Sequence, residues 1–173
     1  MRSYLLVVAL LLVPAVANAA DIPSGTTKFA AVASEKAMTA KIKQGIEAAV
    51  EDMSFITRPI ARSRLKNSNE AFTTMTFKHV GHKLSIQHGD RKPVVSKDDG
   101  SRTKWTREDG ETFVVTQKVS PNKIVQVFYA EDGTKTLTYN FSDGFSKLTV
   151  HVTLESPKLA APMKYTLTYK KAK

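Results

Sequence analysis

The sequence predicts a mainly β protein, in which an N-terminal helical segment precedes an antiparallel up-and-down meander that closes into a barrel of about eight to nine strands. Four Asp-Gly pairs divide the second half of the chain, at residues 99–100, 109–110, 132–133 and 143–144. Asp-Gly favours hairpin turns because glycine adopts a positive φ without steric cost. The runs between the pairs are rich in Val, Thr, Tyr and Phe, which favour strands. The connections are too short for the crossover helix that parallel strands need.

Residues 1–19 are typical of a secretory signal peptide. Arg2 supplies a positive charge, Tyr4 to Val13 is an apolar stretch too short to span a bilayer as a helix, and Ala17-Asn18-Ala19 has the small-x-small pattern of a cleavage site. We therefore expect an exported chain, periplasmic or secreted after cleavage near Ala19, and not transmembrane after processing. An uncleaved anchor helix is the alternative. The absence of cysteine excludes disulfides and favours a bacterial periplasm.

Two helices are expected before the strands. Residues 20–33 read as a flexible leader, and a long amphipathic helix begins near Ser34, a suitable N-cap. A short helix follows, with Thr57 as its cap and Pro59 in its first turn. The long helix is expected to cover or plug the barrel, with binding to a membrane surface as the alternative. Its apolar positions recur at helical spacing: Met38, Ile42, Ile46, Ala49, Val50 and Met53.

Strands and turns account for the rest of a single predicted domain, residues 34–173. The predicted strands are 71–79, 83–88, 92–97, 102–107, 111–119, 123–130, 134–141, 146–155 and 163–170. The last three alternate apolar and polar side chains, so one face of the sheet is expected to be buried and the other wet. Closure into a barrel would protect the edges of so many short strands, and an open sheet curled around the long helix is the alternative.

The C-terminal third resembles the last hairpins of the calycin group, the lipocalins and fatty-acid-binding proteins. The resemblance lies in residues 123–139, KIVQVFYAEDGTKTLTY, the Asp143-Gly144 turn, and residues 165–170, YTLTYK. It implies a barrel that holds a hydrophobic ligand. The Gly-x-Trp motif of lipocalins is missing, because the only tryptophan, Trp105, follows Thr103-Lys104. The Arg-x-Tyr pair of fatty-acid-binding proteins is replaced by Leu167-Thr168-Tyr169, so the resemblance assigns no ligand-binding residue.

No pattern of residues indicates catalysis. The chain has no Gly-x-Ser-x-Gly elbow, Ser-x-x-Lys pair or phosphate-binding glycine loop. The acidic pairs 98–99 and 108–109 precede turn glycines, which explains them without acid–base chemistry. His79, His82 and His88 cluster near one hairpin but lack a carboxylate or cysteine at ligand spacing. We therefore expect a binding protein without a metal or cofactor, and an enzyme remains the third alternative.

The charge is strongly basic, with a formal net charge of +10. It favours anionic partners such as lipid headgroups, whereas nucleic acid is not expected, because the chain carries an export signal and no recognition motif. Arg58 and Arg62 share one helix face and could anchor an acidic headgroup at the barrel mouth. Pairing with Asp98-Asp99 is the alternative.

The predicted function is that of an exported binding protein that carries or senses a small hydrophobic or amphipathic ligand inside the barrel. The alternative is a non-enzymatic module that binds an envelope partner or an anionic surface through its basic exterior. The predicted ligand-binding residues are Tyr139, Phe141, Val150, Val152, Tyr165, Leu167, Arg58 and Arg62.

Overall fold

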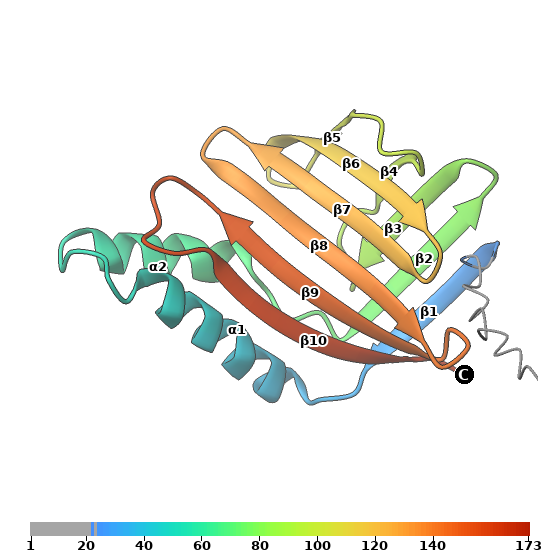
Figure 1. The fold of residues 1–173 in the computed structure, drawn as a ribbon, viewed down its shortest axis with the longest axis horizontal. Helices are drawn as coiled ribbons and strands as arrows, with labels where there is room; N and C mark the ends of the chain where they lie inside the picture. The colour runs from blue at the N-terminus through green and yellow to red at the C-terminus, as the bar shows by residue number, and fades with distance from the viewer. Residues whose placement is uncertain (1–21, 23) are drawn as a thin grey trace, which may run out of the picture.

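A computed structural model describes residues 22 and 24–173 of the chain. These residues form ten antiparallel strands and two helices. The expected signal peptide lies outside these residues. The elements in chain order are β1 (Gly25–Ala31), α1 (Glu35–Val50), α2 (Thr57–Ser68), β2 (Thr74–Val80), β3 (Lys83–His88), β4 (Val94–Lys97), β5 (Thr103–Thr106), β6 (Thr112–Ser120), β7 (Lys123–Ala130), β8 (Gly133–Ser142), β9 (Lys147–Glu155) and β10 (Met163–Lys171) (Figure 1).

The strands form one meander that nearly closes into a barrel. Their spatial order is β4-β3-β2-β1-β10-β9-β8-β7-β6-β5, so β1 and β10 are the paired strands of this sheet that are not consecutive in the chain. At the seam beyond β4, the Gly100 amide donates to the Gln117 carbonyl at 2.9 Å, and the Val119 amide donates to the Asp98 carbonyl at 2.8 Å. These bonds tie the two edges of the sheet together. The calycin-like barrel that the sequence predicts is therefore confirmed.

The strand count is ten because the expected leader contains a strand. Residues 25–31, predicted as part of a flexible leader, form β1, which pairs with β2 and with β10. Phe29 is the one large apolar residue in this short run and is fully buried, so the segment shows too little alternation to be recognised from sequence. All nine strands predicted after it are confirmed, with ends shifted by up to three residues.

Most Asp-Gly turns behave as predicted. Gly100, Gly110 and Gly144 all have a positive φ, between 62° and 89°. Gly133 differs, because the turn there consists of Glu131 and Asp132, and Gly133 begins β8. A Cβ at this position would collide with the carbonyl oxygen of Glu155 on β9. Close strand approach, and not turn conformation, explains this glycine.

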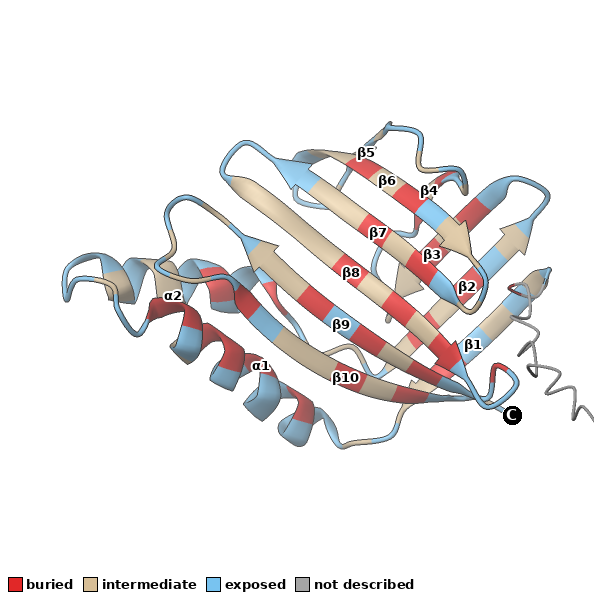
Figure 2. Cartoon of the chain, in the orientation of Figure 1, coloured by how far each residue is buried: buried red, intermediate tan, exposed pale blue. Residues whose placement is uncertain are grey.

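Helix α1 covers a part of β10 that β1 leaves unpaired. β1 pairs with β10 only from Phe29 to Ala31, opposite residues 169–171. The buried stripe of α1 lies along the preceding part of β10 (Figure 2). Ser34 is the N-cap, as predicted, and its hydroxyl accepts from the Ala37 amide. Thr57 does not cap α2, because the Ser54 hydroxyl accepts from its amide instead. The predicted covering helix is confirmed, and it protects a sheet edge.

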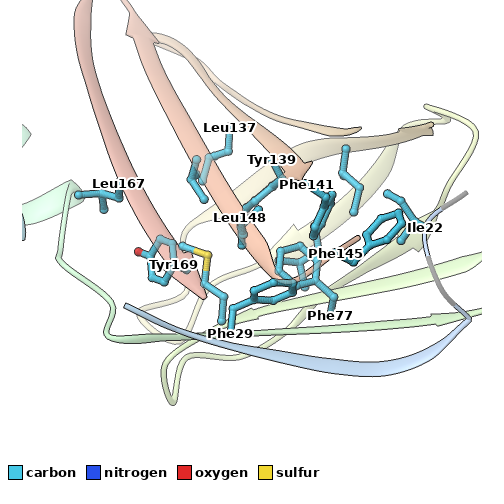
Figure 3. Close-up of a cluster of buried hydrophobic side chains, with 14 of the residues drawn as sticks. Ile22, Phe29, Phe77, Leu137, Tyr139, Phe141, Phe145, Leu148, Leu167 and Tyr169 are labelled. Atoms are coloured by element: carbon cyan, nitrogen blue, oxygen red, sulfur yellow. The ribbon is translucent and has the colours of Figure 1, made fainter. Parts of the chain in front are cut away.

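Two apolar clusters stabilise the fold. The smaller one joins the helices to β10 through Ile42, Ile46, Ala49, Val50, Leu65 and Met163. The larger one fills the barrel, where the rings of Phe29, Phe77 and Phe141 meet edge-on or tilted, with centroids 5.5–5.7 Å apart (Figure 3). Each fully buried aliphatic or aromatic side chain contributes about 1.5–3 kcal/mol. Side chains fill the part of the barrel that contains these three rings.

Candidate functional site

The inner face of the barrel becomes more exposed toward the end where α2 finishes. Four residues of β8 share the inner face. Phe141, Tyr139 and Leu137 are buried, whereas Lys135, nearest the α2 end, is half-buried. The same change occurs across the sheet. On β7, Ile124 and Gln126 have no exposed surface, whereas Phe128 is half-buried. Along these two strands, the inner face is therefore most exposed at the α2 end.

An aromatic wall lines this end. It consists of Trp105 on β5, Phe113 on β6 and Phe128 on β7, all half-buried, with ring centroids 5.8–6.1 Å apart. The indole nitrogen of Trp105 donates to the Pro93 carbonyl at 3.0 Å and fixes the ring. The guanidinium of Arg107 lies over Phe113, 5.4 Å from its centroid. The rings are tilted or edge-on to one another and present an apolar surface with one charged group at its edge.

A chain of polar side chains crosses the interior beyond the wall. His88 Nε2 lies 2.8 Å from the Tyr139 hydroxyl, which donates to Gln126 Oε1 at 2.8 Å. Gln126 is fully buried, and its Nε2 has no hydrogen-bond partner among the described residues. Phe72 stacks on the His88 ring. The amide therefore brings an unused donor into a largely apolar space.

Burial shifts the titration of this polar chain toward neutral forms. Loss of solvation and, to a smaller extent, the positive charge of Lys135 lower the pKa of His88 to about 4. Burial also raises the pKa of Tyr139 well above its usual value. Near neutral pH the imidazole is uncharged, so Nε2–H can donate to the tyrosine oxygen while the tyrosine donates to Gln126.

Lys135 is the charged residue on the inner face. It lies directly opposite Phe128 on β7 and Leu154 on β9. Its Nζ donates to the Ser68 carbonyl at the end of α2, at 3.0 Å. Desolvation and the nearby charge of Arg107 lower its pKa to about 8, and Glu70 opposes that shift.

The apolar residues predicted to line the barrel are on its inner face. Tyr139, Phe141, Val150, Val152 and Leu167 are buried, and Tyr165 is half-buried with its hydroxyl donating to Asn69 Oδ1 at 3.2 Å. They alternate with outward Thr and Lys residues, as the sequence indicates. Their location is confirmed, and their role in ligand binding stays a prediction.

The predicted arginines hold the helices together. Arg58 donates to the carbonyls of Met53 and Glu51 at the end of α1. Arg62 forms a bidentate pair with Glu47 at 2.7–2.8 Å, which lowers the pKa of that carboxyl. Arg58 and Arg62 therefore connect α2 to α1 and the residues that follow it, and they are not part of the candidate site.

The alternative prediction, that Arg58 and Arg62 pair with Asp98 and Asp99, is wrong. The Asp98 carboxylate contacts His79 Nε2 at 2.9 Å and His82 Nδ1 at 3.5 Å. Asp99 accepts from the Ser101 amide within its turn. His88 lies apart in the barrel, and the described residues contain no cluster of three or more side chains that could hold a metal ion.

Sequence reasoning missed Gln117 and Gln126. Both are fully buried and lie opposite each other on β6 and β7. Gln117 is satisfied, since it accepts from the Ser96 hydroxyl at 2.8 Å. A usable signal was present: Gln126 falls two residues after Ile124 and two before Phe128, in phase with core residues. The flanking valines concealed it, because they make the run apolar on both faces.

A separate groove of about 480 Å³ lies between the start of α1 and the end of β10. Met38, Leu167 and Tyr169 contribute to its lining, and Lys41, Lys147 and Lys170 stand among the lining residues. It shares no residue with the aromatic wall or the polar chain.

No helix of the described residues is long and apolar enough to cross a membrane.

No family model matches this chain, and no curated protein matches it. Among solved structures, it is similar to fatty-acid-binding protein 1 of Echinococcus granulosus, with 14% identity over 87% of this chain and 97% of that one and a TM-score of 0.47. It is similar to a Schistosoma mansoni fatty-acid-binding protein in complex with arachidonic acid, with 18% identity, 87% and 96% coverage and a TM-score of 0.47. Human cRBP IV matches at 14% identity, 86% and 97% coverage and a TM-score of 0.47.

Proposed function

We propose that this chain is a binding protein that carries or senses a small hydrophobic or amphipathic ligand inside its barrel. The ligand's apolar part would lie against Trp105, Phe113 and Phe128 at the α2 end. Its polar end would reach the chain formed by His88, Tyr139 and Gln126. Such a division between apolar walls and a few fixed polar groups is characteristic of small-molecule sites.

The unpartnered Gln126 amide is the observation on which this proposal depends. A buried donor without a partner costs about 1–3 kcal/mol. Buried polar groups in native proteins are nearly always satisfied. A ligand oxygen, whether hydroxyl, carbonyl or carboxylate, would satisfy this donor, while the aromatic wall would remove the ligand's apolar surface from water. The supporting evidence is the location of the amide on the inner face, next to the accessible end.

Ligand uptake can be followed through Trp105, the only tryptophan in the chain. We expect titration with hexadecanol to change Trp105 fluorescence and saturate at one ligand per chain, with native mass spectrometry confirming the stoichiometry. Phe128→Ala should weaken binding about tenfold or more, because it removes part of the apolar wall. Tyr129→Ala is the matched control, since Tyr129 lies next in sequence on the outer face. An absence of saturable uptake, or equal losses in both variants, would contradict the proposal.

We also propose that the chain is exported to the periplasm or secreted. The pattern of Arg2, the apolar stretch from Tyr4 and Ala17-Asn18-Ala19 supports this. Expression of the full chain in a bacterial host, followed by fractionation and N-terminal sequencing, tests it. We expect an extracytoplasmic product that begins near Ala20. A cytoplasmic product that retains Met1 would count against export.

An interaction with an anionic surface is the second candidate, and an exposed helical tip favours it. Phe55, Ile56 and Ile60, at the turn between α1 and α2, are 85%, 65% and 55% exposed. Large apolar side chains this exposed and this close together often mark an interaction site. The exposed Arg64 and Lys66 follow on α2, where they could contact lipid phosphates.

Vesicle sedimentation distinguishes this candidate from the carrier. Binding to vesicles that contain phosphatidylglycerol should weaken steeply with salt and fall in Phe55→Ser. Phe113→Ser, inside the barrel, is the comparison variant and should leave vesicle binding intact. Equal binding to neutral vesicles at all salt concentrations would exclude an electrostatic role.

A further inference from the structure

Lys135 and Gln126 are neighbours on the inner face of the barrel. Gln126 is directly opposite Leu137, and Lys135 is directly opposite Phe128, so the two residues are diagonal cross-strand neighbours. Diagonal pairs have Cβ atoms within about 7–8 Å of each other. A four-carbon lysine stem can span that distance. When Lys135 Nζ leaves the Ser68 carbonyl, its amine and the Gln126 amide can reach the carbon and the oxygen of one ligand carbonyl group.

The surroundings of Lys135 favour its neutral, nucleophilic form. Its cross-strand neighbours are Phe128 and Leu154, and its hydrogen-bond partner is the neutral Ser68 carbonyl. No carboxylate of the described residues lies within 4.0 Å of its Nζ. Apolar neighbours and the lack of a paired carboxylate are conditions under which lysines act as amine nucleophiles.

The charges facing Lys135 act in both directions. Arg107 disfavours the ammonium, Glu70 favours it, and the imidazole of His88 is uncharged near neutral pH. Both charges are partly offset by ion pairs, since Arg91 binds the Glu70 carboxylate and Asp109 and Glu111 bind the Arg107 guanidinium. With the pKa lowered to about 8, the free amine is about two orders of magnitude more abundant at neutral pH than in an ordinary lysine.

We propose that Lys135 forms a reversible imine with a hydrophobic aldehyde bound in the barrel. The inference rests on the proposed ligand-binding function and extends it to covalent capture. Gln126 Nε2–H donates to the aldehyde oxygen and polarises the carbonyl. The Lys135 nitrogen attacks the carbonyl carbon, a C–N bond forms, and the oxygen receives a proton from the amine to give a carbinolamine. Loss of the hydroxyl with the second amine proton, as water, yields the C=N bond. Amine plus aldehyde gives imine plus water, and no redox partner is needed.

The test compares hexadecanal with hexadecanol, which has the same chain but cannot form an imine. Sodium cyanoborohydride traps the imine as a secondary amine, and peptide mapping locates it. We expect one adduct per chain, on Lys135, formed at a rate that reaches half its maximum near pH 8. Lys135→Arg should abolish the adduct. Lys104→Arg, at an exposed position on β5, should leave it unchanged. Gln126→Leu should slow adduct formation by about tenfold or more at saturating aldehyde.

The outcomes separate this inference from the proposed function. Saturable hexadecanol uptake together with an adduct confined to Lys135 supports both. Hexadecanol uptake without an adduct, or with adducts spread over exposed lysines such as Lys104, overturns the imine and leaves the carrier intact. An adduct yield in Lys135→Arg equal to that of the unaltered protein also overturns the imine. Failure to bind either compound overturns the carrier and the imine together.

Discussion

Replacing Gly45 by alanine should destabilise this protein, although alanine is the better helix former. Gly45 is buried in α1 where the helix crosses β10. A Cβ at this position would lie 2.5 Å from the carbonyl oxygen of Lys164 and 3.2 Å from its carbonyl carbon. Both atoms belong to the backbone of β10, so no side-chain rotation can relieve the contact.

The magnitude follows from two opposing effects. In an exposed helix, Gly→Ala gains about 1 kcal/mol. Here α1 and β10 have to separate by about 1 Å to reach normal contact, which weakens the dispersion contacts around Gly45. Overpacking of this kind costs about 1–3 kcal/mol. The helix would also move away from Met163, which Ile46 and Ala49 help to bury. We expect a net loss of up to about 2 kcal/mol.

Urea unfolding followed by circular dichroism measures this effect. Gly45→Ala should lower the denaturation midpoint with an unchanged slope, because the surface exposed on unfolding stays the same. Gln44→Ala, at the exposed neighbouring position, is the control and should stay within about 0.5 kcal/mol. A Gly45→Ala protein that is more stable than the parent would refute the close packing of α1 on β10.

Three further outcomes test the core and the polar chain. Ile46→Asp should lower stability by several kcal/mol, because it places an unpaired charge among buried residues; an unchanged thermal midpoint would show that α1 does not belong to one cooperative domain with the barrel. Tyr139→Phe should cost about 1–3 kcal/mol, since it leaves both His88 and Gln126 without their shared partner, and chemical denaturation would reveal a neutral change if that network were absent. His88 has a pKa of about 4 in the folded protein and about 6.5 when unfolded, so the unfolded state binds the extra proton first. Stability should be nearly full above pH about 6.5 and fall by about 3 kcal/mol as the pH drops to about 4. His88→Gln should remove this slope, whereas replacing the exposed His82 should preserve it.

The sequence by itself determined nine of the ten strands described, because hairpin turns and side-chain alternation are local signals. Glycines that need a positive φ mark three of the turns. The alternation along residues 134–141, 146–155 and 163–170 identifies which side chains face inward, since neighbouring residues of a strand point to opposite faces. The stripe of α1 likewise identifies its buried face before any partner is known. These features depend on residues close together in the chain.

The tertiary structure alone decided what the inward side chains meet. The stretch 25–31 is a strand because β2 and β10 pair with it, and its own side chains say little. Gly133 and Gly45 are glycines because another backbone passes close by. Arg58 and Arg62 contact α1 because α2 folds back on it. The polar chain joins β3, β8 and β7, so Gln126 becomes a buried, unpartnered donor only when the barrel forms. Hydrogen bonding and desolvation depend on neighbours that lie far apart in the sequence, so local patterns do not encode them.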